Sequence, residues 1–115
     1  MLNQIVLVGR LVRNPELSES ANGSKYSNIT LAVPRAYKNA DGEYDTDFVN
    51  CKLFTSIAEN TAEYCKKGDL IGVKGRIQSD TYEKDGETKY STEVIAEKVT
   101  FLSSKSKEIN DELEA

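Results

Sequence analysis

The sequence contains no histidine and no tryptophan, and its 115 residues include only two cysteines and two prolines. Histidine is the commonest general base and metal ligand at neutral pH, so its absence removes the most frequent catalytic and zinc-binding arrangements. Cys51 and Cys65 are too widely spaced for a zinc site without histidine, and we interpret them as buried, reduced thiols. We therefore predict no catalytic residue, no metal site and no cofactor.

A long apolar run is also missing, so we expect no transmembrane helix. The first ten residues, MLNQIVLVGR, have neither a basic n-region nor a small-residue cleavage site, which argues against a signal peptide. Both absences favour a cytoplasmic protein. A chain of 115 residues with 38% hydrophobic and 30% charged residues is typical of a single polar domain with a modest core.

The net charge of −4 arises at one end of the chain. Residues 108–115, EINDELEA, hold four acidic side chains and no basic one. Subtracting these four from the 19 acidic residues leaves 15 acidic and 15 basic residues in residues 1–107. A neutral body can carry a basic stripe on one face, so the net charge does not exclude a nucleic-acid partner.

Five segments have the alternating or β-branched composition of strands, and they are residues 3–12, 26–35, 48–55, 70–78 and 92–102. We expect a bend or bulge at Gly9, and we expect Pro34 to end its strand or to place it at a sheet edge. Residues 36–47 contain an Asp-Gly pair and predict a loop or hairpin tip. Residues 79–91 predict a hairpin with KDGE at its tip.

One helix is predicted over residues 56–69, SIAENTAEYCKKGD. Ser56 and Glu59 form a capping-box pattern, and Gly68 is the expected residue just beyond the helix. A single helix between the third and fourth strands of a small all-β chain suggests an OB-fold, the five-stranded Greek-key β-barrel that binds oligonucleotides or oligosaccharides. We place this domain in residues 1–103 and expect residues 104–115 to be a short, acidic, disordered tail.

The segment FVNCKLF, residues 48–54, has an unusual distribution of aromatic side chains. Successive side chains of a strand point to opposite faces, so Val49, Cys51 and Leu53 form an ordinary core face. The opposite face, which should meet water, then carries Phe48, Asn50, Lys52 and Phe54. In residues 70–78 the same alternation puts Ile71, Val73 and Ile77 on one side and Lys74, Arg76 and Gln78 on the other.

Aromatic and cationic side chains are interleaved in three segments that an OB barrel would bring together. Single-stranded nucleic acid offers flat base faces and a charged backbone, and each stacked base contributes roughly 1–3 kcal/mol. The candidate stacking residues are Tyr37, Phe48, Phe54 and Tyr82. The candidate phosphate contacts are Arg10, Arg35, Lys38, Lys52, Lys74, Arg76 and Lys84. The pattern alone also allows the rings to serve as core or as a subunit interface.

Two other classes of protein fit an OB barrel. A nuclease would need clustered carboxylates, and in an extended segment Glu43, Asp45 and Asp47 would share a face beside Asp41. A solvated acidic loop is the commoner reason for such a cluster, and the chain has no paired base and nucleophile, so we do not favour catalysis. The main alternative is an OB-fold protein-interaction module of a replication complex with weak or no DNA binding. A module that binds oligosaccharide is a further variant of this class.

Several blocks of the sequence, in the same order, resemble bacterial and phage-type single-stranded DNA-binding proteins. They are NQIVLVGRLVRNPEL, NITLAVPRAYKNADGE, the run from FVNCKLF to EKDGE, and STEVIAEKVTFL, which together span about residues 1–102. The resemblance implies a homotetramer that wraps single-stranded DNA and protects it in replication, recombination and repair. It also implies that the first strands pair between subunits. The base-stacking aromatic positions of the family fall on Tyr37, Phe48, Phe54 and Tyr82, the set already selected.

The sequence departs from that family pattern in two respects. Many members use tryptophan for stacking, whereas this chain has only phenylalanine and tyrosine. These rings can still stack with a smaller face, so we expect binding to survive in a weaker form. The family usually ends in a long linker and an acidic tip closing in Pro-Phe, which recruits replication and repair proteins. This chain ends in DELEA without that tip, which puts recruitment by this route in doubt.

Overall fold

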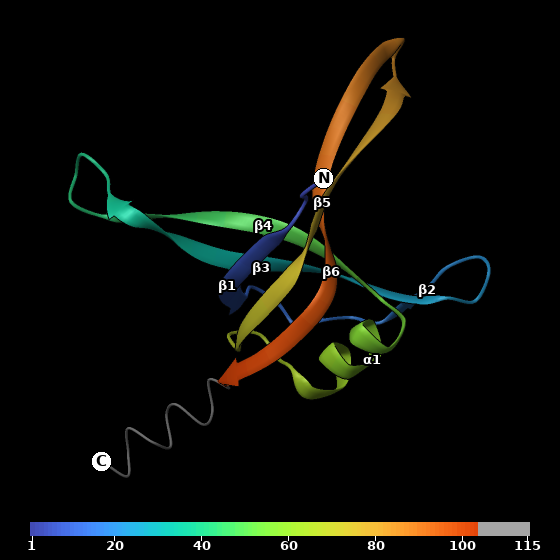
Figure 1. Ribbon diagram of the computed structural model, residues 1–115, viewed down its shortest axis with the longest axis horizontal. Coiled ribbons are helices and arrows are strands. Elements are labelled where there is room, and N and C mark those ends of the chain that lie inside the picture. The colour runs from blue at the N-terminus through green and yellow to red at the C-terminus, as the bar shows by residue number, and fades with distance from the viewer. Residues whose placement is uncertain (104–115) are drawn as a thin grey trace.

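Six strands and one helix make up the part of the chain that the computed structural model describes, residues 1–103 (Figure 1). They are β1 (Ile5–Leu11), β2 (Ser18–Glu19), β3 (Lys25–Lys38), β4 (Tyr44–Phe54), α1 (Thr55–Tyr64), β5 (Leu70–Lys84) and β6 (Glu87–Ser103). The acidic tail predicted for residues 104–115 lies outside the described residues. Within residues 1–103, no helix has both the length and the apolarity needed to cross a membrane.

The strands form one sheet in the order β1-β5-β6-β4-β3-β2, and an additional pairing between β1 and β3 closes it into a barrel. Five strands build the barrel, because β2 has only two residues and pairs with β3 alone. The pairing of β4 with β6 is parallel, whereas the other pairings are antiparallel. With α1 between β4 and β5, this arrangement confirms the predicted OB-fold.

The core fills the barrel and continues beneath α1. Its fully buried members come from every barrel strand and from the helix, and they include Leu11, Leu31, Leu53, Ala58, Ile71 and Val94. Cys51 and Cys65 are both buried and free, as predicted. Burial raises the pKa of each thiol to about 11, so both remain protonated at neutral pH.

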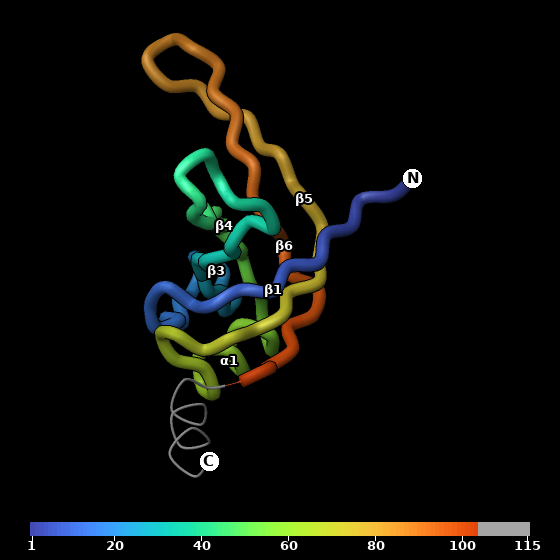
Figure 2. The backbone as a smooth tube through the Cα atoms, turned by 90° about the vertical axis from the view of Figure 1, so that its left-hand side faces the viewer, coloured from blue at the N-terminus to red at the C-terminus, as the bar shows by residue number. Residues whose placement is uncertain are grey.

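Two hairpins extend well beyond the barrel, one formed by β3 and β4 and the other by β5 and β6 (Figure 1). The β5–β6 hairpin points away from α1, towards the top of Figures 1 and 2, whereas the β3–β4 hairpin projects sideways, towards the left of Figure 1. The β5–β6 turn contains Asp85 and Gly86 with φ of 55° and 78°, which confirms the predicted KDGE tip. In the β3–β4 hairpin the turn covers only residues 39–43, because both strands continue into the segment predicted as a loop.

Two expectations about the strands hold only in part. Pro34 does not end β3, which runs on to Lys38 with an irregular register after the proline. It does lie at an edge, because β3 pairs there with β4 alone, and the missing N–H is tolerated. Gly9 is not a bulge, because the register between β1 and β5 passes through Gly9 without a shift, and the alternative of a bend stays a prediction. A side chain at Gly9 would place its Cβ 2.7 Å from the carbonyl oxygen of Ala32, so the glycine permits the close approach of β1 and β3.

The helix differs from its prediction at both ends. It begins at Thr55 directly after β4, with Phe54 at the N-cap and no side-chain cap, so the expected Ser56–Glu59 capping box is absent. Ser56 lies inside the first turn of α1, so it cannot occupy the N-cap position that a capping box requires. The helix ends at Tyr64, and Gly68 (φ 92°) lies in the following turn, where its N–H donates to the carbonyl of Leu11 and not to the helix.

Ile77 is more exposed than the alternation in its strand predicts. Ile71 and Val73 are buried as expected, but Ile77 is 43% exposed because β5 has left the barrel at that point. Its backbone is held by Asn3, whose Nδ2 donates to the Ile77 carbonyl (2.8 Å) and whose Oδ1 accepts from the Ile77 N–H (2.9 Å). The side chain of Asn3 thus continues the β1–β5 pairing past the end of β1.

Candidate nucleic-acid interface

The two faces of β4 differ as the sequence predicts. Cys51 and Leu53 are buried in the core, whereas Phe48 and Phe54 are 68% and 39% exposed. We call the exposed side the outer face, and on β4 it carries Phe48, Asn50, Lys52 and Phe54. The in-register residues of β3 on the same side are Ala32, Thr30, Asn28 and Tyr26. The outer face thus has aromatic side chains at both ends and polar groups between them.

The outer face continues across β6 and β5 towards the second hairpin. Lys52 is in register with Ile95 of β6, and Ile95 is in register with Arg76 of β5. Alternation along β5 then puts Tyr82 and Lys84 on the side of Arg76. Tyr82 is 51% exposed near the hairpin tip. Three strands therefore connect the β4 candidates to those of β5 on one side of the sheet.

The β3–β4 hairpin carries the most exposed candidate ring and the most strongly engaged candidate cation. Tyr37 is 85% exposed. The Arg35 guanidinium donates from Nε and Nη2 to Asp47, with a 3.0 Å contact to Oδ1, and it lies 3.7 Å from Asp45. Hydrogen bonding by Arg35 lowers the pKa of Asp47. A phosphate at Arg35 would have to compete with this carboxylate. Nearby, the Lys38 ammonium lies 5.7 Å from the centre of the Tyr44 ring.

Two candidate cations lie towards β1, apart from the aromatic residues of β4. Lys74 is exposed and in register with Val6 of β1. Arg10 donates from Nη1 to the Gly68 carbonyl, at 3.0 Å. Arg10 therefore lies on β1, the strand next to β5, whereas Lys74 lies on β5 itself, two positions before Arg76 and on the same side of the strand.

Sequence reasoning missed a polar hollow in the middle of the outer face. The hollow has a volume of about 360 Å³, and its lining includes Asn28, Asn50, Lys52, Glu93 and Arg13. Arg13 Nη2 donates to the Thr30 hydroxyl (3.1 Å), which donates in turn to Asn50 Oδ1 (2.9 Å). Arg13 lies between the predicted strands 3–12 and 26–35, so its position depends on long-range contacts that alternation does not reveal.

Tyr26 was also missed, although the sequence held a signal for it. The predicted strand 26–35 places Ile29, Leu31 and Val33 on one face, and Tyr26 lies on the opposite face with Asn28. The Lys52 ammonium is 5.4 Å from the Tyr26 ring centre and 5.5 Å from the Phe54 ring centre. Such distances are typical of cation–π contacts.

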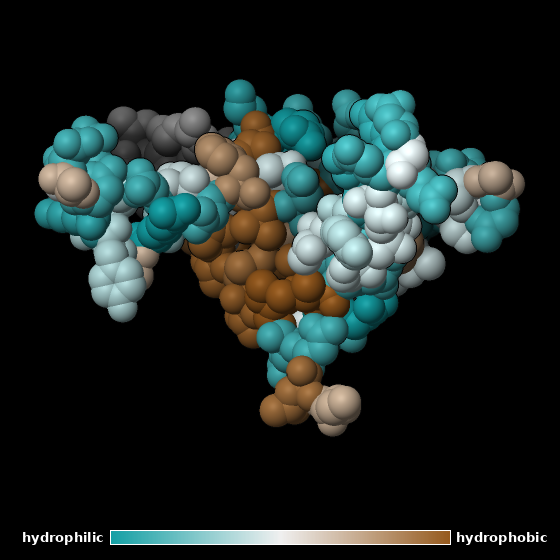
Figure 3. Space-filling view, turned by 90° about the horizontal axis from the view of Figure 1, so that it is seen from above, coloured by the Kyte–Doolittle hydropathy of each residue, from teal (hydrophilic) through white to brown (hydrophobic). Residues whose placement is uncertain are grey.

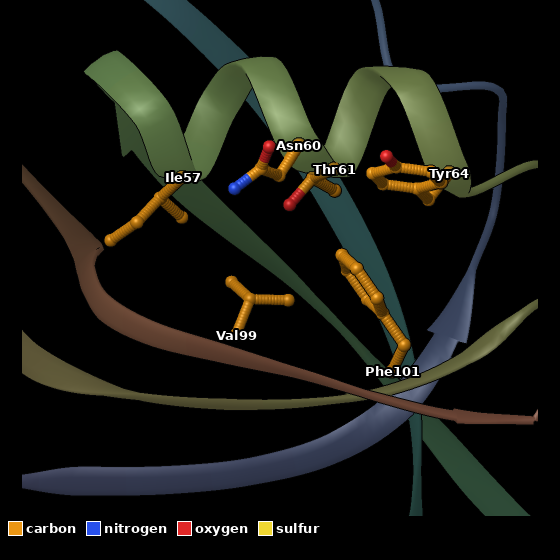
Figure 4. A pocket seen from close by; sticks show the side chains of 6 residues that line it. All are labelled: Ile57, Asn60, Thr61, Tyr64, Val99 and Phe101. Atoms are coloured by element: carbon orange, nitrogen blue, oxygen red, sulfur yellow. The ribbon is translucent and has the colours of Figure 1, made fainter.

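A second hollow, of about 230 Å³, lies between α1 and β6 and differs in character (Figure 4). Its walls include Ile57, Val99 and the tilted pair of Tyr64 and Phe101, whose ring centroids are 6.2 Å apart. None of its lining side chains is charged.

Among residues 1–103, no group of three or more histidine, cysteine or acidic side chains is arranged to hold a metal ion. In particular, Asp45 and Asp47 face Arg35, so they serve as its ion-pair partners.

An apolar surface lies on β1. Val6 and Val8 are 67% and 48% exposed, and Figure 3 shows a hydrophobic area in the middle of the molecule, flanked by polar projections. One edge of β1 pairs with β5 over residues 5–10, whereas β3 pairs with the other edge only at Arg10 and Leu11. Residues 5–9 therefore keep an open strand edge within the described part of the chain.

Comparison with known proteins adds independent evidence. Residues 2–102 match the model of the single-strand binding protein family. Single-stranded DNA-binding protein B of Bacillus subtilis is 50% identical over 109 residues, which cover 94% of this chain and 96% of that protein. Single-stranded DNA-binding protein 2 of Staphylococcus aureus is 49% identical over 106 residues, or 91% of this chain and 75% of the relative. The Bacillus cereus single-stranded DNA-binding protein is 50% identical over 103 residues, but only 61% of its length is covered.

Proposed function

The chain belongs to the single-strand binding protein family, and from this premise we propose that it binds single-stranded DNA without sequence preference. Binding protects the strand during replication, recombination and repair, and it involves no catalytic step. The observation that carries the proposal is the outer face of β4, where two exposed phenylalanines flank a lysine. Exposed rings cost solvation free energy unless a flat apolar partner covers them, and an unpaired base is such a partner.

Four exposed rings are the proposed stacking positions: Tyr37, Phe48, Phe54 and Tyr82. Phe48 and Phe54 are six residues apart on one strand, which corresponds to about 20 Å at roughly 3.3 Å per residue. This distance leaves room for nucleotides between the two rings. Tyr37 and Tyr82 lie on hairpins that leave the barrel in different directions, so a strand of DNA that reaches both has to bend across the outer face.

The proposed phosphate contacts are cations near these rings. Lys52 and Arg76 lie on the outer face and are the best placed. Arg35, Lys38 and Lys84 are on the hairpins, where Arg35 must exchange a carboxylate for a phosphate. Lys74 is on β5, two positions before Arg76, and Arg10 contributes only if the DNA continues over β5 towards β1. Duplex DNA should bind poorly, because its bases are already stacked and inaccessible.

We also propose that the chain forms a homo-oligomer, a tetramer as in the family resemblance, and that it acts in the cytoplasm. The exposed Val6 and Val8 and the open edge of β1 favour pairing between the first strands of two copies. Val8→Glu should lower the molar mass measured by light scattering. An unchanged mass would place the subunit contact elsewhere.

The experiment that tests the proposed function is a titration of fluorescently labelled oligo-dT followed by anisotropy. A duplex of equal length is the control, and the salt concentration is varied. We expect binding of oligo-dT alone, with an affinity that falls as salt rises because phosphate contacts release counterions. Absence of binding would favour the alternative, a protein-interaction module. An affinity for oligo-dT that does not change with salt concentration would exclude a role for the cations.

A further inference from the structure

Tyr26 and Phe54 form the end of the outer face that lies nearest to α1. They are in register on β3 and β4, so their side chains leave the sheet on the same side. Phe54 is 39% exposed and Tyr26 is half-buried, so both rings keep surface that a ligand can contact. Both are absent from the cluster of buried residues and from the apolar residues packed against it.

The ammonium group of Lys52 links the two rings. It lies 5.4 Å from the centre of Tyr26 and 5.5 Å from the centre of Phe54. Lys52 therefore contacts both π faces in the free protein. A cation at this distance is attracted by the ring quadrupoles, but a phosphate would attract it more strongly because the phosphate carries a full negative charge.

A single nucleotide combines the two features that this cluster can recognise. Its base is a flat ring that can stack on an aromatic side chain, and its phosphate is an anion that can bind an ammonium group. Resting on the proposed function, we infer that Tyr26, Lys52 and Phe54 form one nucleotide-binding subsite. Tyr26 is in this subsite an additional stacking ring, and Lys52 exchanges its two ring contacts for the phosphate when the base arrives.

The first test replaces the ring of Tyr26. Tyr26→Leu keeps an apolar side chain but removes the stacking face, and we expect affinity for oligo-dT to fall by at least about fivefold, the lower end of the contribution of one stacked base. Tyr26→Phe keeps the face and should bind within about twofold of wild type. The matched control is Tyr90→Leu, since Tyr90 is 73% exposed on the opposite face of the β5–β6 hairpin. Wild-type affinity in Tyr26→Leu would overturn the inference.

The second test concerns Lys52. Lys52→Met retains the length of the side chain and removes the charge. We expect the slope of log affinity against log salt to become shallower by about 0.7, the value for one phosphate contact on a single strand. Tyr26→Leu should leave that slope unchanged, because a ring releases no counterion. A Lys52→Met slope equal to that of wild type would show that the ammonium does not reach a phosphate.

Tyrosine emission keeps the inference testable if Tyr26→Leu fails to fold, which circular dichroism would reveal. The chain has six tyrosines and no tryptophan, so quenching by oligo-dT reports on tyrosine alone. Tyr26→Phe should lose part of the quenching while retaining its affinity. Full wild-type quenching in Tyr26→Phe would overturn the role of Tyr26. If the wild-type protein binds oligo-dT and the Tyr26 variants bind and quench as the wild type does, the inference about Tyr26 is wrong while the proposed function stands. If the wild-type protein does not bind oligo-dT, the proposed function itself is refuted.

Discussion

The two faces of β4 are made from alternate residues of one short segment, yet they differ in almost every physical property. On the inner side, Leu53 is 0% exposed and Cys51 2%. On the outer side, Phe48 is 68% exposed and polar side chains separate it from Phe54. A large apolar side chain therefore has two different roles in this strand, depending on the parity of its position. Substitutions of neighbouring residues should separate stability from binding.

The largest effect is expected for Leu53→Ala. Leu53 is fully buried in the barrel, so truncation removes apolar burial and leaves a cavity. The free energy of unfolding should fall by roughly 2–5 kcal/mol, as for other buried leucines. Urea denaturation followed by circular dichroism measures the change. A loss below about 1 kcal/mol would mean that the inner face is not packed as described.

The next effect is expected for Phe54→Ala, one residue along the chain. This ring is partly exposed, so the fold should survive, while the affinity for single-stranded DNA should fall by roughly 1–3 kcal/mol. Anisotropy titrations at fixed salt measure the affinity, and the same denaturation experiment measures stability. If Phe54→Ala unfolds the protein, the assignment of the two faces is wrong.

A smaller effect, of the opposite sign, is expected for Asp47→Asn. The exchange removes the carboxylate that engages Arg35 and one negative charge near the proposed path of the DNA. Because an exposed ion pair contributes only about 0.2–1 kcal/mol, affinity should rise by no more than a few-fold. Glu19→Gln is the control, as Glu19 pairs with Lys25 on the β2–β3 hairpin, away from Arg35. Equal affinities in Asp47→Asn and wild type would remove Arg35 from the set of phosphate contacts.

The smallest effect concerns Cys51, which adjoins Lys52 but points into the core. Since burial raises the pKa of this thiol and that of Cys65 to about 11, a thiol-specific reagent at pH 8 should label the native protein very slowly. In denaturing urea both thiols should react at once. Rapid labelling of the native protein would indicate that the inner face opens readily.

Much of this arrangement could be predicted from the sequence because it depends on local alternation. The faces of residues 48–54, the strand order with one helix and the β5–β6 turn at Asp85 and Gly86 were all correct. The family assignment confirms the predictions of single-stranded DNA binding and of a non-catalytic protein. The assignment of individual residues to stacking and phosphate contacts stays a prediction.

The features that were missed depend on contacts between distant segments. Tyr26 becomes notable only once its register with Phe54 is known, and the distance of Lys52 from both rings follows from that register. Arg13 reaches the outer face through Thr30, 17 positions later in the chain. The Ser56–Glu59 capping pattern failed because the helix begins one residue earlier than predicted, at Thr55, so Ser56 lies inside its first turn and not at the N-cap.

The central claim is that the exposed rings of the outer face and hairpins stack on unpaired bases while nearby lysine and arginine side chains bind the phosphates. The most direct measurement is a titration with oligo-dT followed by tyrosine emission, at low and high salt, with a duplex as control. The account predicts strong quenching by oligo-dT and none by the duplex. The oligo-dT concentration needed for half-maximal quenching should increase with salt, because salt weakens the phosphate contacts. No quenching, together with no complex in sedimentation, would contradict it and would assign the exposed phenylalanines to a protein interface.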